Sequence, residues 1–156
     1  MGVVLSANNI SKAFDEKKVL ADVSLHLDAG EVVCVLGVSG VGKTTLFHIL
    51  SGLSLPDAGD VILNGESVTG KPGKVSYMLQ KDLLLPYKRI ADNVAMPLRL
   101  RGESAKSARA QAVKYFPEFG LAGTERLFPH QLSGGMRQRA ALLRTYIASE
   151  GVALLD

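Results

Sequence analysis

The stretch Gly37–Thr44, which reads GVSGVGKT, combines the residue types that hold a polyphosphate. It matches G-x-x-x-x-G-K-[ST] at every fixed position, between an apolar run and helix-forming residues. Glycines let the main chain turn tightly, so that successive N–H groups face phosphate oxygens, and Lys43 would reach the β- and γ-phosphates. The Thr44 hydroxyl would bind Mg²⁺, and Thr45 would bond near the α-phosphate. The sequence therefore predicts a nucleoside triphosphate site made of Gly37, Val38, Ser39, Gly40, Val41, Gly42, Lys43, Thr44 and Thr45.

A second glycine motif lies far along the chain, at Ser133–Gly135. It precedes a long run of helix-forming residues, and Ser133 is a favourable N-cap. A capped amphipathic helix with Arg137, Arg139 and Arg144 in solvent explains the pattern most simply. The unpaired N–H groups of such a helix end also attract anions. Two separate helix N-termini that could each bind phosphate suggest that one nucleotide is held between two surfaces.

The elements that would position these motifs follow from the hydrophobic pattern. Residues 3–27 hold two extended stretches, and the first 65 residues or so are richer in antiparallel-looking strands than a simple doubly wound fold. The run EVVCVLG at 31–37 predicts a strand buried on both faces in a parallel sheet, with Cys34 as a small buried hydrophobe. A helix is expected to begin near Lys43 and to stop at Gly52.

The rest of the chain changes from strands to helices. Asn64-Gly65 predicts a turn, and KVSYML at 74–79 predicts a further strand. From Leu83 to about Tyr146 the pattern is mostly helical, with turns at prolines and glycines. Residues 151–156, GVALLD, predict a buried strand that carries an aspartate at its carboxyl end. This order of elements predicts an α/β fold.

Composition limits the class of protein. The chain has 156 residues, 47% of them apolar and 21% charged, and a net charge of +3. These values fit one globular domain and argue only weakly for nucleic acid. The single cysteine excludes a disulfide within the chain, which fits a reducing compartment. With no apolar stretch of about 18 residues and no visible secretory signal, we expect a cytoplasmic protein.

Four motifs in the order seen here resemble those of the ATP-binding-cassette (ABC) ATPases. LSGGMRQR resembles the family's signature motif, with Met136 in the place more often taken by Gln. VALLD resembles the Walker B strand, Gln80 resembles the Q-loop glutamine, and Phe14 lies where an aromatic residue stacks on adenine. The resemblance implies a P-loop NTPase (RecA-like) core with an antiparallel β subdomain and an inserted α-helical subdomain.

The resemblance also implies boundaries within one partial nucleotide-binding domain. Residues from 1 to about 82 would form the β-rich nucleotide-binding core. Residues from about 83 to 145 would form the helical subdomain with the signature motif, and residues 151–156 the Walker B strand. The carboxyl-terminal part of the fold would be missing.

Roles for single residues follow from the same resemblance. Gln80 and Asp156 would be catalytic, and with Thr44 they would hold Mg²⁺ beside bound ATP. Ser133, Gly134, Gly135 and Met136 would contact ATP that is bound to a second copy of the domain. Two copies would close over two ATP molecules and part after hydrolysis, which would drive a separate transmembrane permease.

The implied partners place the protein on the inner face of the cell membrane. The stretch after Gln80, which includes Asp82, Leu85, Pro86 and Tyr87, is where such families receive the coupling helix of the permease. The sequence most resembles importers of nitrate, sulfonates, taurine or pyrimidine units, so a solute-binding protein is a further expected partner. A nucleic-acid partner is not expected.

The family's next residue after Asp156 is a glutamate that acts as general base. We therefore interpret the sequence as the amino-terminal part of a longer ATPase. Since general-base assistance is typically worth about 10²–10⁴ in rate, this part alone is expected to hydrolyse ATP very slowly. Two alternatives are a naturally short nucleotide-binding module without turnover and a soluble ABC ATPase that acts on nucleic acid. The compact spacing of the motifs argues against the second alternative.

Overall fold

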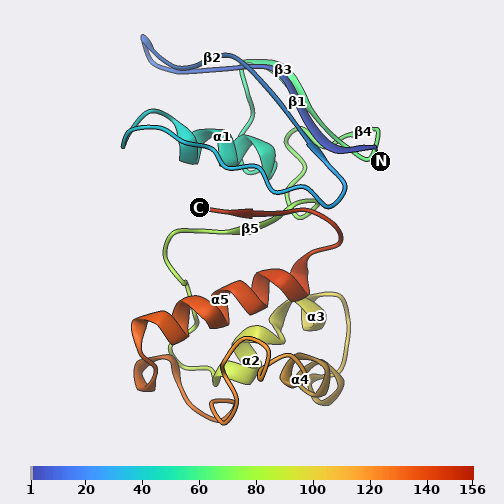
Figure 1. Ribbon diagram of the computed structural model, residues 1–156, viewed down its shortest axis with the longest axis vertical. Helices are drawn as coiled ribbons and strands as arrows, with labels where there is room; N and C mark the ends of the chain where they lie inside the picture. The colour runs from blue at the N-terminus through green and yellow to red at the C-terminus, as the bar shows by residue number, and fades with distance from the viewer. Residues whose placement is uncertain (1) are drawn as a thin grey trace. The chain divides into compact units, whose positions relative to one another are not determined.

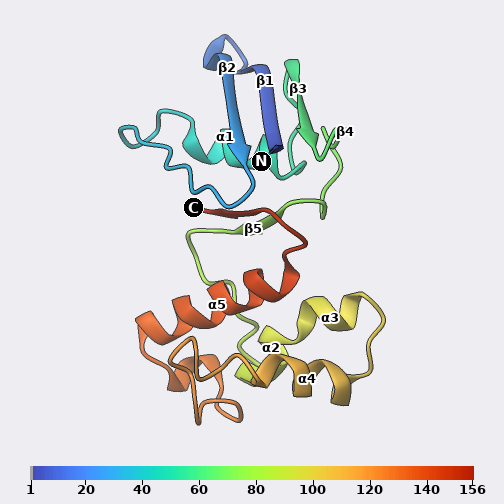
Figure 2. The same cartoon turned by 45° about the vertical axis from the view of Figure 1, so that its right-hand side comes forward.

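A computed structural model of the chain describes residues 2–156, which divide into two units (Figures 1 and 2). The first unit contains the residues up to Val75 together with Glu150–Leu154. The second unit contains Ser76–Ser149 together with Leu155–Asp156. Each unit is described by itself.

The first unit is built on a four-stranded sheet in the order β2-β1-β3-β4. Strands β1 (Val3–Phe14) and β2 (Lys17–Asp28) form an antiparallel pair, and β1 also pairs with β3 (Ala58–Leu63). The short β4 (Glu66–Ser67) pairs antiparallel with β3. The two extended stretches and the antiparallel character predicted for the start of the chain are confirmed.

A tight turn joins β3 to β4 at Asn64 and Gly65. Their φ angles are 50° and 85°. Two central residues with positive φ are typical of a type I′ turn, whose twist matches that of antiparallel strands. The turn predicted at Asn64-Gly65 is therefore confirmed, and it fixes the register in which Leu63 faces Glu66.

Helix α1 (Lys43–Leu50) ends in a glycine cap. The N–H of Leu53 donates to the carbonyl of His48 at 2.8 Å, and the N–H of Gly52 donates to that of Ile49 at 3.0 Å. This pair of bonds is the Schellman motif, which needs a residue with positive φ, and Gly52 has φ 76°. The predicted stop at Gly52 is confirmed.

The stretch 31–37 is not a strand, and this prediction was wrong. Among residues 2–156 no strand pairs with it, and its side chains are exposed except that of the half-buried Val35, with Val32 at 87% and Leu36 at 90%. Cys34 is exposed as well, contrary to the buried position predicted for it. A β-branched run favours extended backbone, but a strand forms only where neighbouring chains accept and donate its main-chain hydrogen bonds.

The second unit is mainly helical, as predicted for this part of the sequence. Figure 2 shows α5 running beside the shorter helices, and it contacts both α2 and α3. The elements are α2 (Ile90–Val94), α3 (Met96–Leu100), α4 (Ala105–Val113), the 3₁₀ helix η1 (Pro129–Gln131) and α5 (Gly134–Ala148). Their shared core is apolar and centres on Phe116, which has no exposed surface.

Two short strands complete the fold. Strand β5 (Ser76–Met78) pairs with β6 (Ala153–Leu155), so strands form where KVSYML and GVALLD predicted them. Val152 and Leu154 are buried while Leu155 is exposed, so β6 buries one face rather than two. Within residues 2–156, none of the helices has the length and apolar character needed to cross a membrane.

Candidate nucleotide-binding site

The loop before α1 has the backbone of a phosphate cradle. Gly40 and Gly42 adopt φ angles of 78° and 110°, which side-chain-bearing residues rarely adopt. A Cβ at Gly42 would lie 2.9 Å from Cγ1 of Val19, and one at Gly37 would lie 2.8 Å from Cγ1 of Val41. Conformation requires glycine at positions 40 and 42, and lack of space requires it at 37 and 42.

The loop ends at an uncapped helix terminus. Gly42 is the N-cap of α1 and has no side chain to accept from the first turn, which carries no acidic residue. The helix therefore presents its positive dipole end and its first amides toward the loop, an arrangement that attracts anions. Thr44 and Thr45 lie in this first turn, Thr44 on an exposed position.

Lys43 is held by its own loop. Its ammonium donates to the carbonyl oxygens of Gly37 at 2.6 Å and of Val38 at 2.9 Å. These bonds hold the ammonium against the carbonyls of the loop and use two of its three N–H donors. A phosphate that enters the loop would offer charged acceptors in place of neutral carbonyls, and hydrogen bonds between charged groups are the stronger ones.

Phe14 lies at the end of β1, in the hairpin whose next strand contacts the cradle through Val19. Phe14 as a residue is 52% exposed, and the ammonium of Lys12 lies 5.6 Å from its ring centroid. An exposed aromatic face is available for stacking on a base. The first unit therefore contains Phe14 together with all of Gly37–Thr45.

The second glycine motif opens α5 as predicted. Ser133 has an extended backbone, and its hydroxyl oxygen accepts from the N–H of Met136 at 3.3 Å. Ser133, Gly134 and Gly135 are all exposed, and Met136 is half-buried against the helical core. The N-terminal end of a long helix is therefore open to solvent, with small residues that allow close approach of a ligand.

The segment that contains Gln80 lies against α5. Gln138 donates to the carbonyl of Gln80 at 3.2 Å, and Arg137 donates to the carboxylate of Asp82 at 3.2 Å. Arg144 donates to the carbonyls of Asp82 at 2.7 Å and of Leu83 at 2.9 Å. Arg137 and Arg144 thus bond main chain and carboxylate rather than project only into solvent. Burial lowers the pKa of Arg144, and the nearby charge of Asp82 opposes that shift.

Asp156 is held at the edge of β5. Its N–H donates to the carbonyl of Met78 at 3.0 Å, and the hydroxyl of Tyr77 donates to its carboxylate at 3.0 Å. Burial, together with the hydrogen bond and negative charge of Asp156, raises the pKa of Tyr77 well above its usual range. The neutral phenol therefore orients one carboxylate oxygen.

Each unit contains an oxygen group of the kind that magnesium binds. Within the part of the chain that the structure describes, no three His, Cys, Asp or Glu side chains form a metal cluster. Mg²⁺ prefers oxygen ligands and commonly keeps several waters while it binds one or two protein groups and the phosphates. The hydroxyl of Thr44 and the carboxylate of Asp156 have the chemistry that this mode requires.

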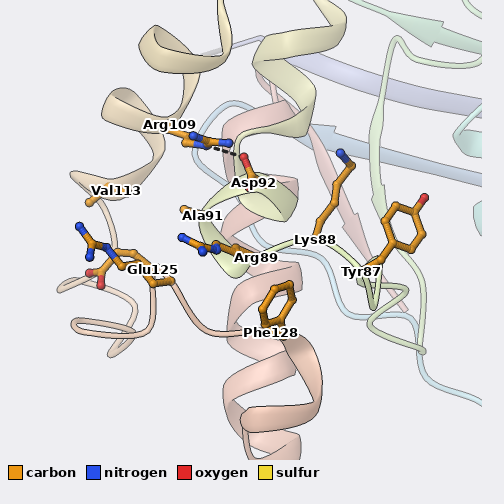
Figure 3. Close-up of a pocket in the computed structure, with 10 residues that line it drawn as sticks. Tyr87, Lys88, Arg89, Ala91, Asp92, Arg109, Val113, Glu125 and Phe128 are labelled. Atoms are coloured by element: carbon orange, nitrogen blue, oxygen red, sulfur yellow. Dashed lines mark hydrogen bonds and ion pairs between the residues drawn. The ribbon is translucent and has the colours of Figure 1, made fainter.

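A cavity of about 570 Å³ opens on the helical unit, next to the segment that follows Gln80 (Figure 3). Arg109 is paired with Asp92 across it. Among the described residues, Lys88, Arg89 and Arg126 form no ion pair, and although Glu125 also lines the cavity, basic side chains outnumber carboxylates there. Tyr87 and Phe128 add aromatic surface to this wall.

The structure places the predicted residues in two groups. Phe14 and Gly37–Thr45 belong to the first unit, whereas Gln80, Ser133–Met136 and Asp156 belong to the second. Apart from Tyr87, the sequence did not identify the cavity residues, nor the bonds that Arg137 and Arg144 make. The seven-residue spacing of these two arginines was a usable signal, because it places them on one face of a helix.

Comparison with known proteins gives consistent matches. The family model described as ABC transporter matches residues 20–156. A solved structure titled "Dimeric Structure of MJ0796, a Bacterial ABC Transporter Cassette" superimposes with a TM-score of 0.86 at 25% sequence identity, covering 97% of this chain and 73% of that one. The P-loop NTPase fold predicted from the sequence is therefore confirmed.

Curated relatives match over almost the whole chain. The formylaminopyrimidine import ATP-binding protein ThiZ of Halalkalibacterium halodurans is 42% identical over 154 residues, which are 98% of this chain and 59% of the relative. The taurine import ATP-binding protein TauB of Yersinia pestis is 38% identical over a region that covers 98% of this chain and 60% of the TauB chain. The lipoprotein-releasing system ATP-binding protein LolD of Bordetella pertussis is 41% identical over a region that covers 99% of this chain and 73% of the LolD chain. The chain thus spans about three fifths of the length of ThiZ and TauB.

Proposed function

Since this chain belongs to the ABC transporter family, we propose that it is the ATP-binding part of a subunit that powers solute import across a membrane. The cradle at Gly37–Thr44 is the observation that carries this proposal. Its positive-φ glycines, its helix end without a side-chain cap and the ammonium of Lys43 beside the loop carbonyls support the assignment of an anion site. The names of ThiZ and TauB, both import proteins, support import over export.

Nucleotide binding would proceed by an exchange of hydrogen bonds in the loop. Lys43 leaves the carbonyls of Gly37 and Val38 and donates to the β- and γ-phosphates, while the amides at the start of α1 donate to the remaining oxygens. Phe14 stacks on the adenine. Since Lys43 is already drawn over the loop, little rearrangement of the main chain is required.

We further propose roles in metal binding and turnover for three residues named by the family resemblance. Thr44 and Asp156 would hold Mg²⁺, with Gln80 close to the metal and the attacking water. The ion, when bound, neutralises charge on the phosphates. Tyr77 contributes by keeping the Asp156 carboxylate in one orientation. ATP hydrolysis by the intact protein is the reaction that these residues serve.

A second copy of the chain would complete the site. The open N-terminal end of α5 would donate from its first amides, and from Ser133, to the γ-phosphate of ATP that the other copy holds. The MJ0796 cassette is described as dimeric by its title, which supports a dimer here. Closure over ATP and parting after hydrolysis would then supply the movement.

The cavity beside Tyr87 is our proposed contact with the transmembrane permease. It lies next to the segment after Gln80, so contact there can influence the catalytic glutamine. The unpaired Lys88, Arg89 and Arg126 favour a docking segment that carries carboxylates, because opposite charges steer association and fix its register. A solute-binding protein would deliver the solute to the permease, with no nucleic acid involved. The ATPase would then lie on the cytoplasmic face.

The decisive experiment measures binding of Mg²⁺-ATP by calorimetry to the parent chain and to Lys43→Ala. We expect Lys43→Ala to lower the affinity at least tenfold, since a charged hydrogen bond contributes about 1.5–3 kcal/mol. Lys71→Ala is the matched control, because it removes the same charge from an exposed position in the same unit. Equal affinities of Lys43→Ala and the parent would refute the proposal.

A further inference from the structure

Helix α5 donates hydrogen bonds to three main-chain carbonyls within residues 80–83. Gln138 binds the carbonyl of Gln80, while the two terminal nitrogens of Arg144 bind the carbonyls of Asp82 and Leu83. Arg137 donates a hydrogen bond to the carboxylate of Asp82. These donors come from a single helix, and all of the groups lie in the second unit.

The backbone of residues 80–83 needs such support. Leu83 has φ 44°, a left-handed conformation that a leucine rarely adopts. Its side chain is 53% exposed, so packing contributes little to holding that conformation. The carbonyl of Leu83 is instead held by Arg144, and the next amide, that of Leu84, donates to the carboxylate of Asp82 at 3.1 Å.

Resting on the function proposed above, we infer that Arg144 is a positioning residue that fixes the Gln80 segment to α5. The helix that begins at Ser133 and the segment that carries Gln80 then move as one body. A guanidinium suits this role because its planar fork presents two N–H groups to two adjacent carbonyls, which a single ammonium does not reproduce. A signal that reaches the segment at Asp82–Leu85 is thereby passed to the open end of α5.

A mobility measurement on the nucleotide-free chain tests this inference. Hydrogen–deuterium exchange of the segment 80–86 is compared in the parent, Arg144→Met and Arg144→Lys. We expect exchange in Arg144→Met to rise about tenfold or more, because hydrogen bonds to a charged group are lost. Arg144→Lys should lie between the two. Arg139→Met is the matched control, since Arg139 is exposed on the same helix and donates nothing to residues 80–83 among those described.

A spectroscopic reporter separates positioning from general destabilisation. The chain contains no tryptophan, so Leu83→Trp places a single indole on the segment, and Tyr87→Trp places one in the neighbouring loop. Adding Arg144→Met should lower the fluorescence anisotropy of the first indole and leave that of the second unchanged. An equal fall at both sites would mean that Arg144 only stabilises the unit, and would overturn the inference.

The remaining outcomes are also decisive. If Arg144→Met exchanges at 80–86 no faster than Arg139→Met, the inference is wrong. If Arg144→Met fails to fold, Arg144→Lys is judged by the same criterion, and exchange equal to the parent overturns the inference. Since no nucleotide is present, failure here leaves the ATP-binding proposal intact, and failure of ATP binding leaves this result intact.

Discussion

The side chain of Asn93 forms hydrogen bonds with both the N–H and the carbonyl of Leu85. Its side-chain oxygen accepts from the Leu85 N–H at 2.7 Å, and its amide nitrogen donates to the Leu85 carbonyl at 3.1 Å. The same nitrogen lies 3.1 Å from the carbonyl of Lys88, and Asn93 has no exposed surface. One buried amide thus shapes the loop that presents Tyr87 and Lys88 to the proposed permease contact.

Replacing this amide should destabilise the helical unit. Asn93→Ala leaves partly buried main-chain groups of Leu85 and Lys88 without their partner, and a fully buried group left unpaired costs about 1–3 kcal/mol, which is the upper bound for each. Asn93→Asp should cost more at neutral pH, because the carboxylate oxygen in place of the amide nitrogen would face the carbonyls of Leu85 and Lys88, which cannot donate to it. Chemical denaturation of the three proteins at pH 7 checks this order. An Asp variant as stable as the parent would show that Asn93 does not need its donors.

The helical core should depend strongly on Phe116. Its side chain is fully buried at the centre of the apolar cluster, so Phe116→Ala leaves a cavity and is expected to cost about 3–5 kcal/mol. Tyr87→Ala, at a position that is 71% exposed in the same unit, is the control and should change stability little. Urea titrations followed by circular dichroism measure both. A loss below about 1 kcal/mol for Phe116→Ala would mean that the cluster repacks.

Gly59 is required by lack of space as well as by its conformation. It has φ 96°, and a Cβ there would lie 2.4 Å from the carbonyl oxygen of Asn8. Gly73 has a similar φ of 87° with nothing within 4 Å, so it isolates the conformational cost. Strain of this kind costs about 1–3 kcal/mol. We expect Gly59→Ala to lower the melting temperature more than Gly73→Ala, and equal shifts would contradict the steric argument.

Acid should lower the stability of the first unit partly by protonating Asp60. Hydrogen bonds from Thr69 and Ser67 lower the pKa of its carboxyl below the usual 3.8. A carboxyl whose pKa is lower in the folded state stabilises the fold fully above its unfolded pKa, and this stability is lost as the pH falls through the folded pKa. Asp60→Asn should therefore lose less stability than the parent when the pH falls below 3.8. Melting temperatures across that range provide the measurement, and parallel curves would exclude Asp60 as a contributor.

Local signals predicted much of the fold because they act over a few residues. Asn64-Gly65 supplies the two positive φ angles of its turn, and Gly52 supplies the cap of α1. Ser133 caps α5 for the same kind of reason, since its hydroxyl bonds an amide three residues away. The loop at Gly37–Thr44 also belongs to this class, because its glycines and Lys43 lie within one short stretch of the chain.

Only the tertiary structure decided which groups meet across the chain. The apolar run 31–37 has the composition of a strand, yet a strand requires hydrogen-bond partners from other segments, and none pairs with it among residues 2–156. Arg144 and Leu83, or Tyr77 and Asp156, are far apart in sequence, so no spacing rule predicts their bonds. The sequence by itself determined the conformation of the Gly37–Thr44 loop and the chemistry of its side chains, whereas folding determined what holds Gln80 and Asp156 in place.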